Sequence, residues 1–144
     1  MINAYITFNG NCREAMTFYK ECLGGKLSLQ TVGETPMSSV MPKQMKNCIL
    51  HATLSSKNFV LMGSDMVNEK GLLKGNAITL VLHCKTEKEI KQLYASLSIG
   101  GRKIDPLQMN HHGHLIGTVT DKYDLCWMLY FDAEKRNQKQ KTVN

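Results

Sequence analysis

A helix pattern that begins at a capping residue and ends at two glycines occurs twice in the chain, and it constrains the fold more than any other feature. The first copy is NGNCREAMTFYKECLGG at residues 9–25, and the second is TEKEIKQLYASLSIGG at 86–101. Asn11 and Thr86 are the candidate N-caps, and each is followed by a glutamate three residues later, as in a capping box. The caps lie 75 residues apart, so the chain is predicted to contain two copies of one unit.

Each predicted helix has one apolar stripe, because its apolar residues recur at steps of three and four. In the first helix the stripe consists of Ala15, Met16, Phe18, Tyr19, Cys22 and Leu23, and in the second of Ile90, Leu93, Tyr94 and Leu97. The paired glycines provide left-handed stops. One face of each helix is therefore expected to be buried against a sheet.

Short β-type runs precede and follow each helix. In the first half they are 4–8, 26–32, 48–54 and 58–62, with a long loop at 33–46, and in the second half 77–82, 103–107, 111–119 and 125–131. The predicted class is α+β, with two βαβββ modules that form a curved mixed-sheet cleft. Module one spans 1–62, a linker spans 63–76, and module two completes a single domain at 132.

Composition indicates an ordinary globular protein. Of the 144 residues, 42% are apolar and 21% are charged, and there is neither a membrane-spanning apolar run nor a signal-peptide pattern. The five cysteines lack a C-x-x-C pair and fit buried free thiols, so a cytoplasmic location is expected. Half of the net charge of +6 comes from a polar tail at 133–144, which we interpret as solvated rather than nucleic-acid-binding.

Four motifs resemble the PhnB-like branch of the vicinal oxygen chelate superfamily, which also contains glyoxalase I, extradiol dioxygenases and bleomycin-resistance proteins. They are FNGNCREAMTFYKECLGG at 8–25, GSDM at 63–66, ITLVL at 78–82 and GHLIGTVTDKYDLCWM at 113–128. The resemblance implies the glyoxalase/bleomycin-resistance fold. Members are often labelled as relatives of a demethylubiquinone methyltransferase, which would imply S-adenosylmethionine binding. A G-x-G-x-x-G loop after a strand is missing from the sequence, so methyltransferase activity is disfavoured.

The resemblance also implies where metal-using members place their ligands. Carried onto this sequence, the four positions are Asn3 or Ala4, Leu61, Ala77 or Asn76, and Met128. None of these is a histidine, cysteine or acidic residue, so the inherited metal site is expected to be absent and no cofactor is predicted. The chain also has His112-Gly113 where the family usually has Trp-Gly, and Asp124 where a turn glycine is usual.

Histidines are the candidate catalytic groups. Three of the five lie in HHGH at 111–114, and His51 lies in a predicted strand. His51 and His112 are candidate acid–base residues, and a shifted metal site would use His51, His112 and His114. The alternative interpretation of HHGH is an exposed polar loop that enters a strand. Asp65 is interpreted as a local turn-stabilising carboxylate rather than a catalytic base.

Strand alternation assigns side chains to the two faces of each sheet. The cleft face is predicted to carry Tyr5, Thr7, Thr79, Cys126, Met128 and Tyr130, and the helix face Ile6, Phe8, Ile78, Leu80, Trp127 and Leu129. From these positions, the predicted ligand-binding residues are Tyr5, Thr7, His51, Met128 and Tyr130. Such a cleft is mostly apolar with a few hydroxyls, which suits a small, partly apolar ligand.

Three functions fit this pattern. The first is metal-free binding of a small molecule by a homodimer, since four-stranded sheets leave exposed edges that a second chain can cover. The second is a lyase or isomerase of the glyoxalase or dioxygenase kind, and the third is sequestration of a drug. The mildly basic body favours a neutral or anionic ligand, and neither a nucleic-acid partner nor a membrane partner is expected.

Overall fold

Both predicted βαβββ patterns fold into four-stranded sheets with one helix each. The structure is a computed structural model that describes residues 1–135; apart from its first three residues, the predicted tail at 133–144 lies outside them. The chain divides into two compact units between Leu73 and Lys74, which is inside the predicted linker. The expectation of an α+β fold with two curved mixed sheets is confirmed. Among the described residues, no helix is both long and apolar enough to cross a membrane.

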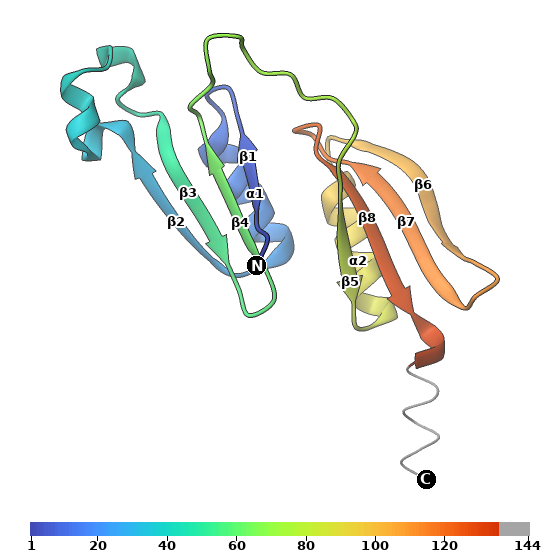
Figure 1. The fold of residues 1–144 in the computed structure, drawn as a ribbon. Coiled ribbons are helices and arrows are strands. Elements are labelled where there is room, and N and C mark those ends of the chain that lie inside the picture. The colour runs from blue at the N-terminus through green and yellow to red at the C-terminus, as the bar shows by residue number, and fades with distance from the viewer. Residues whose placement is uncertain (136–144) are drawn as a thin grey trace. The chain divides into compact units, whose positions relative to one another are not determined.

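The first unit has the strand order β1-β4-β3-β2 (Figure 1). Strands β1 and β4 are parallel, whereas β4, β3 and β2 are antiparallel neighbours. The elements are β1 (Ala4–Thr7), α1 (Cys12–Leu23), β2 (Lys26–Thr31), β3 (Ile49–Ser55) and β4 (Val60–Ser64). Three short 3₁₀ turns occupy the loop between β2 and β3, namely Val32–Glu34, Pro36–Ser39 and Lys43–Met45.

The second unit repeats this arrangement with the order β5-β8-β7-β6. Its elements are β5 (Thr79–Cys84), α2 (Glu87–Ser98), β6 (Arg102–Met109), β7 (His114–Thr120) and β8 (Cys126–Asp132). The parallel pair is β5 with β8, which is the counterpart of β1 with β4. The two halves therefore share one topology, as the repeated helix pattern predicts.

The core of each unit lies between the helix and one face of its own sheet. In the first unit it includes Phe8, Ala15, Met16, Phe18, Tyr19, Ala52 and Leu54, and in the second Ile90, Tyr94, Leu97, Val119, Trp127, Leu129 and Phe131. These are the stripe residues of the helices and alternate residues of the strands. The prediction for Ile78 is wrong. Its side chain is 74% exposed rather than packed under a helix, because Ile78 precedes the first paired residue of β5.

The second glycine of each helix stop lies against the backbone of a neighbouring strand. A Cβ atom on Gly25 would be 2.7 Å from the carbonyl oxygen of Ser55, and one on Gly101 would be 2.2 Å from that of Thr120. Both distances are too short for a side chain, so glycine is required for the close approach of the chain after each helix. Asp124, which stands where the family usually has a turn glycine, has a left-handed backbone with φ at 66°.

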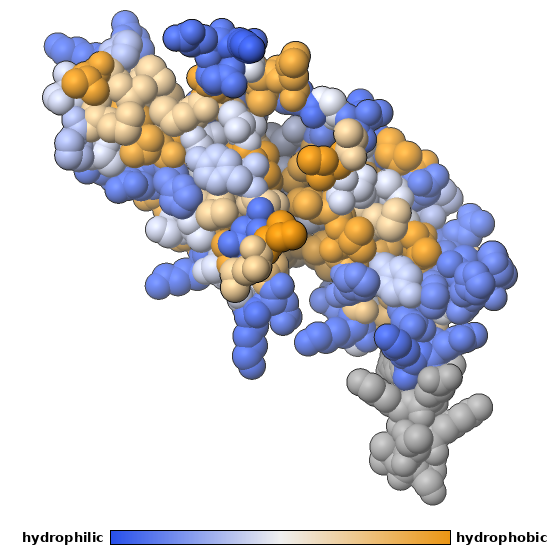
Figure 2. Space-filling view, in the orientation of Figure 1, coloured by the Kyte–Doolittle hydropathy of each residue, from blue (hydrophilic) through white to orange (hydrophobic). Residues whose placement is uncertain are grey.

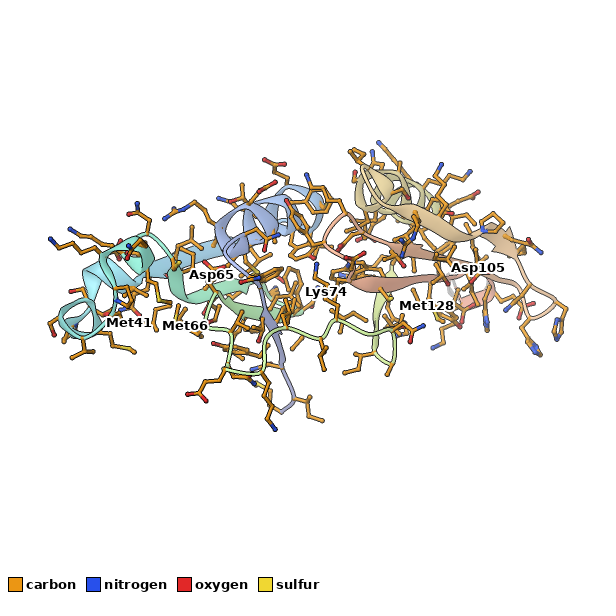
Figure 3. The ribbon with its side chains drawn as sticks, turned by 90° about the horizontal axis from the view of Figure 1, so that it is seen from above. Met41, Asp65, Met66, Lys74, Asp105 and Met128 are labelled. Carbon is orange, nitrogen blue, oxygen red and sulfur yellow. The ribbon has the colours of Figure 1, made fainter. Side chains whose placement is uncertain are left out.

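The first helix is not capped as predicted. Asn11 is the N-cap residue, but its side chain makes no capping hydrogen bond. Instead, Asp65 Oδ1 accepts hydrogen bonds from the N–H groups of Gly10 at 3.0 Å and Cys12 at 2.9 Å, and Asp65 Oδ2 accepts one from Ile49 N–H at 2.8 Å. Asp65 is thus a long-range cap that joins α1 to β3, not the local turn carboxylate that we predicted. Figure 3 labels Asp65 near the start of α1.

The second helix follows the capping-box prediction closely. Thr86 Oγ1 accepts a hydrogen bond from Glu89 N–H at 3.0 Å. The return bond runs from the N–H of Lys85, one residue before the cap, to Glu89 Oε2 at 2.7 Å. The two helices therefore begin at equivalent places but are capped by different chemistry.

Candidate functional site

The face of each sheet opposite its helix is the place where a ligand could bind, and we call it the open face. Within each unit, the single helix covers the other face. Residues paired across strands point to the same side, so strand pairing defines which side chains share the open face. On the first sheet, Tyr5, Met62 and Thr53 form one such row.

The open face of the first sheet brings together three predicted ligand-binding residues, Tyr5, Thr7 and His51. The rings of Tyr5 and His51 have centroids 6.1 Å apart, and Tyr5 is 53% exposed. His51 Nε2 and Thr53 Oγ1 share a hydrogen bond of 3.0 Å, which fixes the imidazole on the sheet. This part of the open face offers a phenol ring with its hydroxyl, an imidazole and two threonine hydroxyls to a ligand.

The open face of the second sheet carries the other two predicted residues, Met128 and Tyr130. Met128 pairs with Val81 and Thr118, and Tyr130 pairs with His83 and Ile116. Figure 3 labels Met128. On the side of the molecule seen in Figure 2, hydrophobic and hydrophilic residues are interspersed. Partial desolvation, with a smaller contribution from Asp132, raises the pKa of Tyr130, so its hydroxyl is neutral at physiological pH.

The HHGH segment forms the hairpin between β6 and β7. Asn110 Oδ1 accepts hydrogen bonds from the N–H groups of His112 and His114, both at 3.0 Å, and Gly113 has φ at 77°. His111 and His112 are exposed at the tip, whereas His114 begins β7 and is half-buried. The interpretation as a polar loop therefore describes His111 and His112, but His114 belongs to the sheet.

The candidate catalytic and metal residues are distributed over both units. His51 lies in the first unit, and His112 and His114 lie in the second, with His112 and His114 ring centroids 6.1 Å apart. Strand pairing adds two residues that we did not predict as site residues, His83 and Asp132. Alternation from Tyr130 along β8 points to Asp132, and alternation from Thr79 along β5 points to His83, which lies one residue beyond the predicted strand 77–82.

The residues at the superfamily's metal positions do not fit a divalent ion. Leu61 is 6% exposed and lies on the helix face, so the open-face positions of β4 are its neighbours Val60 and Met62. The open-face residues at or beside the four superfamily positions are Tyr5, Met62, Thr79 and Met128, which carry hydroxyl and thioether groups rather than the imidazoles or carboxylates that zinc or calcium requires. His83 and Asp132 lie further along β5 and β8. Within residues 1–135, no three His, Cys, Asp or Glu side chains come together as metal ligands would.

All five cysteines are free thiols, as the sequence predicted. Cys12 and Cys84 are buried, and Cys22, Cys48 and Cys126 are partly exposed. Burial is the main cause that raises the pKa of Cys12 to about 12 and that of Cys84 to about 11. These two thiols are therefore protonated and unreactive at physiological pH.

The topology of two βαβββ units is that of the glyoxalase/bleomycin-resistance fold. It matches the structure of a glyoxalase/bleomycin resistance protein/dioxygenase family enzyme from Burkholderia phytofirmans PsJN with a TM-score of 0.61, at 9% identity over 90% of this chain and 97% of that one. A closer match is protein PA1353 from Pseudomonas aeruginosa, with a TM-score of 0.78 and 31% identity over 92% of this chain and 97% of that one.

Sequence comparison gives the family within this fold class. Residues 1–130 match the family described as 3-demethylubiquinone-9 3-methyltransferase. Protein YjdN of Escherichia coli (strain K12) is 28% identical over 138 residues, which cover 89% of this chain and 92% of the relative. The chain belongs to this family, which is the PhnB-like branch of the vicinal oxygen chelate superfamily that the motifs indicated.

Proposed function

We propose that this PhnB-like protein binds a small, partly apolar molecule on the open faces of its sheets, without the metal ion of its superfamily. The proposal rests on the kinds of side chain that the open faces carry. Each combines apolar and aromatic side chains that are half-buried or exposed with a few polar groups, such as Tyr5, His51 and Met62 on the first sheet and Met128 and Tyr130 on the second. Ligand sites of proteins have this composition.

At the centre of each sheet, the polar groups on the open face can form hydrogen bonds but carry no fixed charge. Hydroxyls of Thr7, Thr53 and Thr118 and the imidazole of His51 can each orient a ligand through one hydrogen bond. The chain has a net charge of +6, which favours encounter with a neutral or anionic molecule over a cation.

A lyase or isomerase is the second candidate function, and the position of His51 favours it. The imidazole is held by Thr53 at 3.0 Å beside the Tyr5 ring, where it could move a proton to or from a bound substrate. His112 is a weaker acid–base candidate because it is exposed at a hairpin tip. A methyltransferase remains disfavoured, because the sequence lacks the glycine-rich loop of the common cofactor-binding fold.

We further propose a cytoplasmic homodimer. The edge strands of the two sheets are β1, β2, β5 and β6, and apolar side chains near two of these edges are exposed, among them Ile2, Ile78 and Val81. Pairing with a second chain would cover such edges. Five free cysteines fit a reducing compartment.

Methionine methyl spectra test the binding proposal. Met62 and Met128 lie on the open faces, whereas Met16 is fully buried under the first sheet's helix face and provides an internal control. With [methyl-¹³C]methionine-labelled protein, a fragment library is expected to contain compounds that shift the Met62 or Met128 signal and leave Met16 unchanged. Saturable shifts confined to methionines away from both open faces would contradict the proposal.

The same compounds distinguish a binder from an enzyme. Turnover of a bound compound that is lost in His51→Ala or in His112→Ala would establish the second candidate function and would assign the acid–base role to that histidine. Saturable binding with no change in the compound supports the binder. His111→Ala is a suitable control because His111 is exposed at the hairpin tip and is not an acid–base candidate.

A further inference from the structure

A row of three rings crosses the open face of the second sheet. His83 of β5, Tyr130 of β8 and His114 of β7 are its members. The His83 and Tyr130 centroids are 5.3 Å apart with an edge-to-face angle of 64°, and the Tyr130 and His114 centroids are 4.9 Å apart at 55°. Direct pairing of His83 with Tyr130 across the strands produces this contact. The rings form an aromatic surface on which a further planar ring can pack.

Asp132 lies beside His114 at one end of this row and places a carboxylate next to its imidazole. It pairs with His114 across β7 and β8, and its Oδ2 atom lies 3.7 Å from His114 Nε2. The 3.7 Å separation is longer than a hydrogen bond, but of the two neutral tautomers the nearby carboxylate favours the one with its proton on Nε2, and that tautomer leaves Nδ1 as a hydrogen-bond acceptor. The His114 and Asp132 side chains are 26% and 19% exposed, so the pair is partly shielded from water but within reach of a ligand.

The position of His114 is fixed by its backbone as well as by its ring. Its N–H donates to Asn110 Oδ1 at 3.0 Å, and its carbonyl oxygen accepts a hydrogen bond from Asn110 N–H at 2.8 Å. The neighbouring titratable groups are Tyr130, Asp132 and His112. No trio of His, Cys, Asp or Glu in the part of the chain that the structure describes is arranged for a metal ion, so the arrangement fits an organic ligand better than a cation.

We propose that His83, Tyr130 and His114 form a subsite for a planar ring that carries a hydroxyl group, the chemical class of phenols. The ring packs against Tyr130 and His83, and the hydroxyl donates a hydrogen bond to Nδ1 of His114, while Asp132 holds the imidazole in the accepting tautomer. This inference rests on the proposed function and assigns a ligand class and an orienting pair to it.

Two probes that differ in one group test the subsite. 4-Methoxyphenol has the ring and a hydroxyl that stays protonated at neutral pH, and methoxybenzene has the ring alone. Equilibrium dialysis gives both dissociation constants. Wild-type protein is expected to prefer 4-methoxyphenol by about tenfold, which corresponds to one hydrogen bond at about 1.4 kcal/mol. His114→Phe keeps a ring and loses the acceptor, so it should abolish this preference and leave the binding of methoxybenzene unchanged.

Two more variants locate the effect. Tyr130→Leu removes the central ring and should weaken the binding of both probes, whereas Phe59→Leu removes a half-buried ring from the turn between β3 and β4 and should change neither. Equal affinity of wild-type protein and His114→Phe for 4-methoxyphenol would overturn the subsite, as would the absence of binding of either probe. Neither result affects the proposed function if other fragments still shift the Met62 or Met128 methyl signals.

Discussion

The Oδ1 atom of Asp65 accepts a hydrogen bond from the backbone N–H of Cys12 at 2.9 Å, so the first turn of α1 is capped by a side chain 53 positions away in the sequence. The same carboxylate accepts hydrogen bonds from Gly10 and Ile49, and Asp65 is only 7% exposed. One residue at the end of β4 thus connects the start of the helix to the start of β3.

Asp65→Ala is expected to lower the free energy of unfolding by roughly 3 kcal/mol, because it leaves backbone donors of Gly10, Cys12 and Ile49 without their acceptor in a buried region. Urea denaturation monitored by circular dichroism measures the change. Asn11→Ala is the matched control, since the Asn11 side chain makes no capping bond, and it should cost less than about 0.5 kcal/mol. Equal losses in the two variants would contradict the long-range cap.

Thr86 provides the conventional cap of α2, and its removal should have a smaller effect than the removal of Asp65. Thr86→Ala is expected to cost about 1 kcal/mol, because a single hydrogen bond from Glu89 N–H is lost at an exposed helix start. Thr86→Ser retains the hydroxyl and should restore most of the stability. A Thr86→Ser variant as unstable as Thr86→Ala would show that the methyl group, not the hydroxyl, matters.

Stability is expected to fall as the pH rises above about 9. The thiols of Cys12 and Cys84 have pKa values raised from 9.0 to about 12 and about 11, so between these limits the unfolded chain releases protons that the folded chain retains. Ionisation then favours the unfolded state. Urea denaturation at pH 8 and pH 10 should show a smaller decrease for Cys12→Ala than for wild-type protein. An equal decrease in Cys12→Ala and in the control Cys48→Ala, which removes a partly exposed thiol, would contradict this account.

Trp127 is a fluorescent probe of the second unit, because its indole ring is hydrogen-bonded to Asp121. The indole Nε1–H donates to Asp121 Oδ2 at 2.8 Å, and Asp121 Oδ1 accepts from the N–H groups of Tyr123 and Leu125. Asp121→Ala should therefore lower stability by roughly 2 kcal/mol or more. Because Trp127 is the only tryptophan and is 2% exposed, its fluorescence emission should move to longer wavelength in this variant. Unchanged emission and stability would contradict the role of Asp121.

The sequence predicted the regular elements well because helices and strands impose local periods. The steps of three and four in 15–23 and 90–97, and the paired glycines after them, are local signals, and the structure has both helices where these signals indicate. Each of the eight predicted β-type runs overlaps an observed strand, with ends that differ by up to three residues. Even the left-handed turn at Asp124 is a local property of its residue type.

The long-range contacts could not be derived in the same way. Asp65 was interpreted as a local turn residue because nothing in its neighbourhood shows that Gly10 and Cys12 lie beside it. Likewise, Tyr130 was predicted as a ligand-binding residue from alternation, but its ring contact with His83 depends on the pairing of β5 with β8, which lie almost fifty residues apart. The family resemblance places Leu61 at a metal-ligand position, but in the observed register its side chain points into the core.

The central claim is that this family member binds an organic small molecule without a stoichiometric metal ion. Elemental analysis and native mass spectrometry on one gently purified sample test it most directly. We predict a dimer with less than about 0.1 divalent ion per chain, far below the occupancy of a complete, tightly binding site, that takes up an organic ligand identified by the methionine methyl spectra. One metal ion per chain that is lost in His112→Ala or His114→Ala would contradict the claim and would make metal-assisted catalysis the function of the protein.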